Sequence, residues 1–311
     1  MITVISLYCL YRHLKVLTII RKYYSKYYGV QDVHSNAMNK NIKVGILKSH
    51  NPNAPTLFLL DGLRAFDSNS GWIINTDVLQ FFADKNVNVI IPFGGGGTYY
   101  SDWINDDPTL GKVKWETFLT RELPGHLNGQ GIKTQNNSAV AGISMAGSSA
   151  LTLTAHHGDM FKAAASLSGY PAILNPAMQA GVSYTVGVMN GDAKNMWGNF
   201  GNSLWAYNDP KTNVVKLRGK DIYLSAGWGI PSVKDIGKFL NNNQTAKDWA
   251  VGGDQLEKIA SASTADFLIA AKLSGVNVNS HLTTVGYHTW SYWNDEIKLA
   301  WDQTLAPALF R

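Results

Sequence analysis

The sequence has little cysteine and little charge. Its only cysteine is Cys9, which argues against a disulfide framework, a thiolate metal site and a cysteine nucleophile. Charged residues make up 16% of the chain, and the net charge of +5 is scattered along it. This pattern gives no support for nucleic-acid binding, although a mildly basic protein can favour an anionic surface such as a cell envelope.

A phosphate-binding motif is also missing. Four glycines, 94–97, follow an apolar run as they would in a nucleotide loop, but no Gly-Lys-Ser/Thr sequence comes after them. We therefore expect these glycines to form a flexible loop lining a cleft. We expect no cofactor and no metal ion.

The N-terminus lacks the arrangement of an ordinary secretory signal. Residues 1–11 are mostly apolar but too few to span a bilayer. The basic residues between 12 and 26 follow this stretch instead of preceding it, and tyrosines stand where a cleavage site of small residues would be. We expect residues 1–30 to be an atypical leader or an N-terminal extension, with a mis-assigned start as the alternative.

Hydrophobic residues make up 45% of the chain and aromatic residues 11%, which suits a substantial core or a protein that binds sugars or lipids. Continuous apolar runs alternate with segments of helical spacing, which indicates a mostly parallel sheet covered by helices on both faces. The predicted strands are 41–47, 56–60, 88–92, 138–143, 161–167, 221–226 and 278–285. The predicted helices are 76–85, 115–128, 148–156, 254–273 and 293–306. We expect one α/β domain, residues 31–311, with a cap-like insertion at about 175–210.

The segment around Ser144 has the strand–turn–helix pattern of a nucleophile elbow. An apolar run ends in Gly142-x-Ser144-x-Ala146, and a helix-forming run follows at once. Small residues are needed there because the turn holds the serine in a cramped backbone conformation. Taken alone, the same pattern also fits a packed helix with a serine N-cap.

A serine nucleophile needs a histidine base and an acid, which follow it in the order Ser, acid, His in this kind of fold. The histidines after Ser144 are His156 and His157 at a helix end, His281 within a predicted strand, and His288 just after that strand. A loop at that place can reach the serine, so His288 is the best base. Spacing does not choose among the acids Asp235, Asp248, Asp254, Glu257 and Asp266.

Stabilising the oxyanion requires two backbone N–H groups, one from the residue after the nucleophile and one from the loop after an early strand. Met145 supplies the first position. The Asp61–Arg64 turn is the right kind of loop for the second and nominates Leu63, although Asp61-Gly62 also reads simply as a turn.

Several blocks, in the same order along the chain, resemble the antigen 85-type mycolyltransferases. They are LLDGLRA (59–65), GWIINT (71–76), YSDW (100–103), KWETFLT (114–120), GISMAGSSA (142–150), NDP (208–210) and HTWSYW (288–293). The resemblance spans roughly residues 33–301, and an alanine at position 146 is the family's own form. It implies an α/β-hydrolase fold with a Ser–Glu–His triad.

Position by position, the resemblance implies Ser144 as nucleophile, His288 as base and Glu257, in QLE at 255–257, as acid, with Asp254 as the fallback. It implies Leu63 and Met145 as the oxyanion amides. The residues that match the family's trehalose-binding positions are Asp61, Arg64, Asn75 and Trp290.

The implied reaction is the transfer of a mycolyl group from trehalose monomycolate to trehalose monomycolate or to cell-wall arabinogalactan, in a secreted or envelope-bound enzyme. The family's paired cysteines are replaced here by 106–112, and 227–253 diverges from the family, which leaves acceptor choice and acyl-chain length open. A carboxylesterase or lipase with the same triad is the first alternative. A non-catalytic carbohydrate- or matrix-binding relative is the second, and such a protein would lack the serine.

Overall fold

The computed structural model describes residues 27–241 and 252–311. Its centre is an eight-stranded sheet with the strand order β1-β2-β4-β3-β5-β6-β7-β8. The strands are β1 (Tyr28–Ser35), β2 (Lys40–Leu47), β3 (Thr56–Leu60), β4 (Asn88–Pro92), β5 (Ser138–Ile143), β6 (Phe161–Leu167), β7 (Asp221–Ile230) and β8 (Asn277–Val285). The pairs β1–β2 and β2–β4 are antiparallel, and all the others are parallel.

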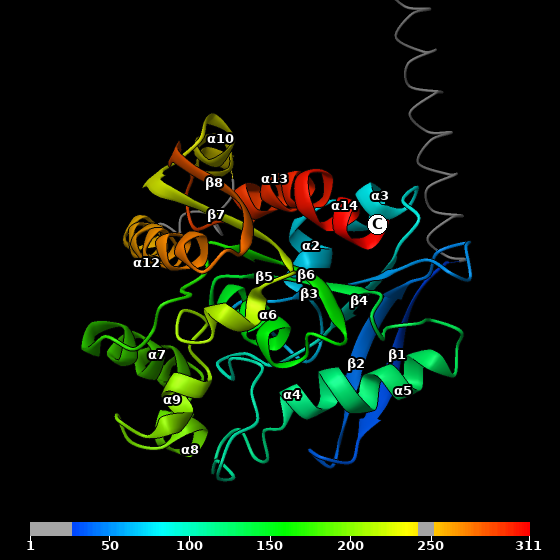
Figure 1. The fold of residues 1–311 in the computed structure, drawn as a ribbon, viewed down its shortest axis with the longest axis horizontal. Coiled ribbons are helices and arrows are strands. Elements are labelled where there is room, and N and C mark those ends of the chain that lie inside the picture. Colours follow the sequence, from blue (N-terminus) through cyan, green and yellow to red (C-terminus); the bar gives the residue numbers. More distant parts are fainter. Residues whose placement is uncertain (1–26, 242–251) are drawn as a thin grey trace, which may run out of the picture.

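Helices cover both faces of this sheet (Figure 1). One face carries α6 (Met145–His156), α12 (Gly253–Leu273) and a continuous helical segment made of α4 (Trp115–Thr117), the π-helical η1 (Phe118–Glu122) and α5 (Leu123–Asn128). The other face carries α2 (Gly71–Asn75), α3 (Val78–Phe82), α13 (Trp290–Ala300), η3 (Trp301–Leu305) and α14 (Ala306–Leu309). The α/β-hydrolase fold expected from the sequence is confirmed.

The pattern of β3 shows why the sheet lies between two layers. All five of its residues are buried. Phe58 and Leu60 pack into the core under α6, whereas Leu57 and Leu59 pack into the core under α13. Because successive side chains of a strand point to opposite faces, a strand buried on both faces must be apolar throughout, as this one is.

The segment 175–210 forms three helices, α7 (Pro176–Val188), α8 (Ala193–Trp197) and α9 (Ser203–Tyr207), which lie together at one side of the molecule (Figure 1). Its buried residues, among them Val186, Trp197 and Trp205, belong to the same hydrophobic core as α6. A short 3-10 helix, η2 (Val214–Leu217), leads from this segment back to β7.

Several elements lie where the sequence pattern predicted no helix or strand, among them α2, β1 and a helix after β7. Strand β1 starts at Tyr28, so residues 28–30 of the predicted leader belong to the sheet, and the rest of it up to residue 26 lies outside the described residues. Helix α10 (Val233–Asn241) follows β7. The helix predicted at 76–85 is shorter, Val78–Phe82. Within the described residues, no helix has the length and apolarity needed to cross a membrane.

Candidate active site

Ser144 stands at a strained turn between β5 and α6. Its backbone angles are φ 52° and ψ −125°, in the region that side-chain-bearing residues seldom adopt. The turn is tight enough that a Cβ at Gly142 would lie 2.1 Å from the carbonyl oxygen of Ala146, so only glycine fits there. The strain and the glycine are what a nucleophile elbow requires.

A continuous hydrogen-bonded chain joins the three side chains expected to form the triad. His288 Nε2 lies 2.9 Å from Ser144 Oγ, and His288 Nδ1 lies 2.8 Å from Glu257 Oε2. Ser144 follows β5, Glu257 lies in the first turns of α12, and His288 lies between β8 and α13. Since β5 and β8 run parallel in the sheet, their carboxyl ends bring these distant residues to one edge.

Glu257 is fully buried, and its other oxygen is satisfied as well. Oε1 accepts hydrogen bonds from Ser168 Oγ at 2.8 Å and from the backbone N–H of Gly227 at 2.7 Å. Ser168 in turn accepts a hydrogen bond from the indole of Trp293, whose ring packs edge-on against His288. A buried carboxylate with this many donors is held in place and oriented toward the imidazole.

The other candidate acids make different bonds. Asp254 is partly exposed and pairs with Lys258, and Asp266 pairs with Lys211. Asp235 is buried but accepts hydrogen bonds from Thr289 and Ser291 and not from a histidine. Asp248 lies outside the described residues. Among the described candidates, Glu257 is therefore the carboxylate that the fold brings to His288.

The remaining histidines after Ser144 also have carboxylate partners away from the serine. His156 and His157, at the end of α6, both lie within 3.0 Å of Glu116. His281, within β8, lies 2.8 Å from Glu296.

The two backbone amides proposed for the oxyanion hole lie on either side of Ser144. A Cβ built on Gly62 would be 3.5 Å from Ser144 Cβ, which places the turn containing Leu63 directly beside the serine. Met145 is the first residue of α6, where backbone N–H groups have no partner within the helix. In the described part of the chain, neither the Leu63 nor the Met145 N–H donates to another protein group.

Asp61 and Trp290, two of the four predicted sugar-binding residues, are held next to this turn. Asp61 Oδ2 accepts hydrogen bonds from Ser70 Oγ and Gly71 N, both at 2.8 Å, and burial raises the pKa of Asp61 to about 6 despite these bonds. The ring of Trp290 covers Gly71 so closely that a Cβ there would lie 2.0 Å from it, and it packs edge-on against Trp72.

Arg64 and Asn75, the other two, are exposed beside this turn and at the end of α2. The described residues contain no ion pair between Arg64 and Asp61, and the Asp61 side chain is held by Ser70 and Gly71 instead.

Tyr170 was not predicted from the sequence, because nothing in its local pattern marks it. Its ring lies 6.3 Å from that of His288. Burial, reinforced by the negative charge of Glu257, raises the pKa of Tyr170 far above its usual value, and a hydrogen bond with Ser144 opposes this only in part. The phenol is therefore neutral at physiological pH, and its hydroxyl lies 3.5 Å from the carbonyl oxygen of Leu256.

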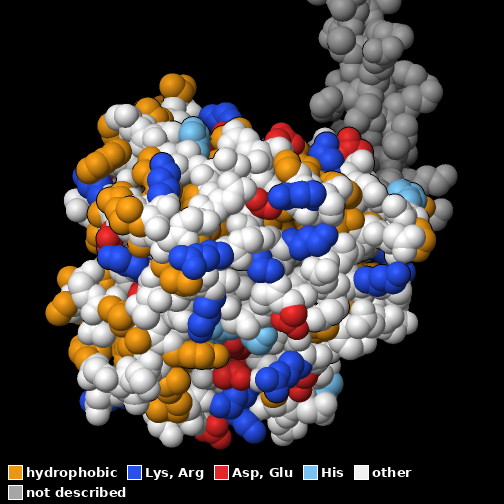
Figure 2. Space-filling model, viewed as in Figure 1, with side chains coloured by type: hydrophobic (Ala, Val, Ile, Leu, Met, Phe, Trp, Pro, Cys, Tyr) orange, Lys and Arg blue, Asp and Glu red, His pale blue; other side chains and the backbone are white. Residues whose placement is uncertain are grey.

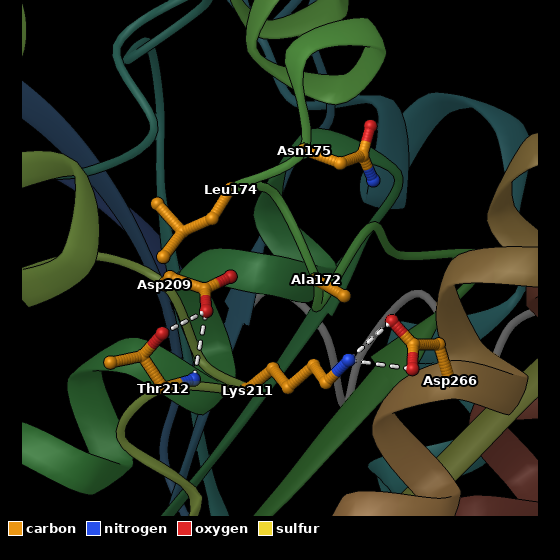
Figure 3. Close-up of a pocket in the computed structure, with 7 residues that line it drawn as sticks. All are labelled: Ala172, Leu174, Asn175, Asp209, Lys211, Thr212 and Asp266. Atoms are coloured by element: carbon orange, nitrogen blue, oxygen red, sulfur yellow. Dashed lines mark hydrogen bonds and ion pairs between the residues drawn. The ribbon is translucent and has the colours of Figure 1, made fainter. Parts of the chain in front are cut away.

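A pocket of about 310 Å³ lies apart from these residues, between the start of α7, the end of the α7–α9 segment and α12 (Figure 3). Its charged groups already have partners. Lys211 bridges to both oxygens of Asp266, and Asp209 accepts from Thr212 and from the backbone of Ile173. None of the predicted site residues lines it.

The sheet order, the strained serine turn and the hydrogen-bonded Ser–His–Glu chain define an esterase-type α/β-hydrolase. A family model described as putative esterase matches residues 35–301. The crystal structure of MPT51 from Mycobacterium tuberculosis superimposes with a TM-score of 0.73 at 22% identity, covering 90% of this chain and 98% of that one, and so agrees on the fold.

Curated relatives give a narrower assignment. The diacylglycerol acyltransferase/mycolyltransferase Ag85A of Mycobacterium ulcerans is 40% identical over 279 residues, which cover 85% of this chain and 77% of the relative. The corresponding Ag85B of Mycobacterium avium is 37% identical over 279 residues, covering 85% and 78%. The chain belongs to the antigen 85-type mycolyltransferase family, as the sequence blocks indicated.

Proposed function

We propose that this protein transfers a mycolyl or similar long-chain acyl group from trehalose monomycolate to a sugar acceptor through an acyl-Ser144 intermediate. The observation that carries the proposal is the hydrogen-bonded chain from Ser144 through His288 to Glu257. It occurs in a chain that is 40% identical to a relative named diacylglycerol acyltransferase/mycolyltransferase.

In the first half of the reaction His288 takes the proton of Ser144 Oγ as that oxygen attacks the ester carbonyl of the donor. Glu257 orients the imidazole and stabilises its positive charge. The backbone amides of Leu63 and Met145 stabilise the tetrahedral oxyanion, and one such donor is worth about 3 kcal/mol of barrier. His288 then protonates the departing sugar oxygen, the carbonyl re-forms and the acyl-serine remains.

In the second half an acceptor hydroxyl gives its proton to His288 and attacks the acyl-serine, which restores Ser144 and releases the acylated sugar. Transfer exceeds hydrolysis only if the acceptor is held in place at a high effective concentration. Asp61, Arg64, Asn75 and Trp290 are suited to this, because they offer a carboxylate, a guanidinium, an amide and a ring face. The acceptor is trehalose monomycolate or arabinogalactan, and the reaction takes place at the cell envelope, where such substrates lie.

Mass spectrometry after incubation with trehalose monomycolate, with and without added trehalose, tests this mechanism. We expect an acylated Ser144 peptide and a diacylated sugar. In Ser144→Ala both should vanish, with a rate loss on the order of 10⁶-fold and with sugar binding kept. Release of free acid at the same rate with and without acceptor would identify a carboxylesterase instead. Acyl transfer that survives Ser144→Ala would exclude the mechanism.

Trp290→Ala tests the sugar site separately from the triad. Because Trp290 packs on Gly71 and Trp72 and is not part of the hydrogen-bonded chain of Ser144, His288 and Glu257, we expect KM for trehalose to rise roughly tenfold, as for the loss of one stacking contact. Hydrolysis of a short-chain chromogenic ester should change less than threefold. Phe310→Ala, which removes an exposed aromatic ring at the far C-terminus, is the matched control and should change neither constant.

A further inference from the structure

Asp235 is a buried carboxylate in an otherwise exposed helix. It lies in the first turn of α10 with 1% of its surface exposed, between the exposed residues Lys234 and Ile236. Its Oδ2 accepts hydrogen bonds from the backbone N–H of Ser232 at 2.9 Å and from Ser232 Oγ at 2.6 Å. Those two bonds cap the start of the helix and use one of the two carboxylate oxygens.

The other half of the carboxylate points away from its own helix. Asp235 Oδ1 accepts a hydrogen bond from Thr289 Oγ1 at 2.9 Å and another from Ser291 Oγ. Burial raises the pKa of Asp235, but the hydrogen bonds from Ser232, Ser291 and Thr289 outweigh it and leave the pKa below its ordinary value. The group is therefore ionised at neutral pH, and each bond it accepts is assisted by charge.

The two hydroxyls that Asp235 holds alternate along the chain with two functional side chains. His288 reaches Ser144, and Trp290 covers Gly71, whereas Thr289 and Ser291 turn to the opposite side and meet at Asp235. A displacement of this short loop would move the base and the sugar platform together.

We propose that Asp235 is a positioning residue, which fixes the segment 288–291, the end of the loop after β8 and the first residues of α13, and thereby sets both the base and the acceptor site. This inference rests on the proposed function, because positioning this segment matters only if His288 is the base and Trp290 binds the sugar. A capping role for α10 alone would need Oδ2 but not the bonds at Oδ1.

Asp235→Ala is the first test. Removing the carboxylate frees both hydroxyls, so we expect kcat for a short-chain chromogenic ester to fall roughly 10- to 100-fold and KM for trehalose to rise in the same variant. Both are measured at a temperature where the variant is fully folded by circular dichroism. A purely structural role would lower the melting temperature and leave both constants unchanged.

Two variants separate the halves of the carboxylate. Asp235→Asn keeps an oxygen that can accept from Thr289 and Ser291 but cannot accept from the Ser232 backbone, so it should retain activity within about threefold while losing stability. Ser232→Ala removes a hydroxyl on the helix side only and should behave as wild type in both kinetic constants. An Asp235→Asn variant as slow as Asp235→Ala would overturn the proposal.

The double variant Thr289→Val, Ser291→Ala removes the two hydroxyls that donate to Asp235 and so breaks the same contact from the other side. This double variant should reproduce the kinetic loss of Asp235→Ala, and the triple variant should lose little more, because both changes break one interaction. If Asp235→Ala does not fold, the kinetics of this double variant test the positioning role instead. Wild-type kinetics in it, or fully additive losses in the triple variant, would overturn the proposal. Failure to form a diacylated sugar would refute the proposed function alone, since the ester assay reports on the loop without it.

Discussion

Two glutamate–histidine pairs, one joining α12 to the loop after β8 and the other joining α13 to β8, have the same distance between histidine and carboxylate. In each pair the histidine Nδ1 lies 2.8 Å from a carboxylate oxygen, Glu257 for His288 and Glu296 for His281. Both glutamate side chains are almost completely buried, at 0% and 3% exposed. Only His288 has a serine at its other nitrogen.

The surroundings of the two pairs differ more than their distances. The His288 side chain is 7% exposed and packs against Trp293, whereas that of His281 is 43% exposed on strand β8. The second oxygen of Glu296 accepts from the hydroxyl of Tyr223. The serine beside His288 and the dry surroundings of that histidine are what distinguish the two pairs, and both are features of a catalytic pair.

The largest expected contrast is between His288→Ala and His281→Ala. Without His288 the serine has no base, and we expect acyl transfer to fall on the order of 10⁶-fold, as in other serine triads. His281→Ala should keep activity within about threefold. Rates of diacylated sugar formation measure both. Comparable losses of activity in the two variants would contradict the prediction, because they would show that the contact with Ser144 does not distinguish His288 from His281.

Substituting the two glutamates should produce a smaller difference in activity than substituting the two histidines. Glu257→Gln keeps the shape of the side chain but removes the charge that stabilises the imidazolium, so we expect kcat to fall about 10⁴-fold. Glu296→Gln, which is isosteric in the same way, should leave kcat within about threefold. Single-turnover acylation of Ser144 isolates the step concerned. An unaffected rate of acylation in Glu257→Gln would mean that Glu257 is not the acid of the triad.

The sequence alone predicted most of the sheet, because strands buried on both faces are continuous apolar runs. Strands β3, β4, β5 and β6 start and end where the pattern placed them. Strand β1 was missed because its residues are mainly exposed, and α10 was missed because it is short and lies within the segment 227–253 that diverges from the family.

The site was predicted unevenly, for a physical reason. Ser144 and His288 stand out locally, one by the small residues around it and the other by following a strand. Glu257 came from family resemblance, since five acidic residues had suitable positions. The contacts of Ser168, Tyr170 and Asp235 could not be predicted, because they join segments whose distance depends on the folded chain.

Glu296 and Glu116, which binds His156 and His157, should affect the stability of the fold in opposite ways as the pH changes. Burial raises the pKa of Glu116, but the bonds from the two histidines outweigh it and lower the pKa to about 2, whereas at Glu296 burial prevails and the pKa lies above 4.5. The folded state therefore favours the ionised form of Glu116 and the protonated form of Glu296. Glu116 stabilises the fold above about pH 4.5 and loses this as the pH falls toward 2. The contribution of Glu296 is present below about pH 4.5 and is lost as the pH rises through its raised pKa.

Urea unfolding at a series of pH values should show these opposite slopes. The stability gap between wild type and Glu116→Gln should narrow as the pH falls from about 5 to about 3, because Glu116 takes up a proton in the unfolded chain over this range while it stays ionised in the folded one. The difference in stability between wild type and Glu296→Gln should narrow as the pH rises over the range in which Glu296 ionises. A buried charge then destabilises the wild type, whereas the glutamine variant carries none. Parallel trends in the two variants would mean that their histidines, and not the burial of the glutamates, control the titration.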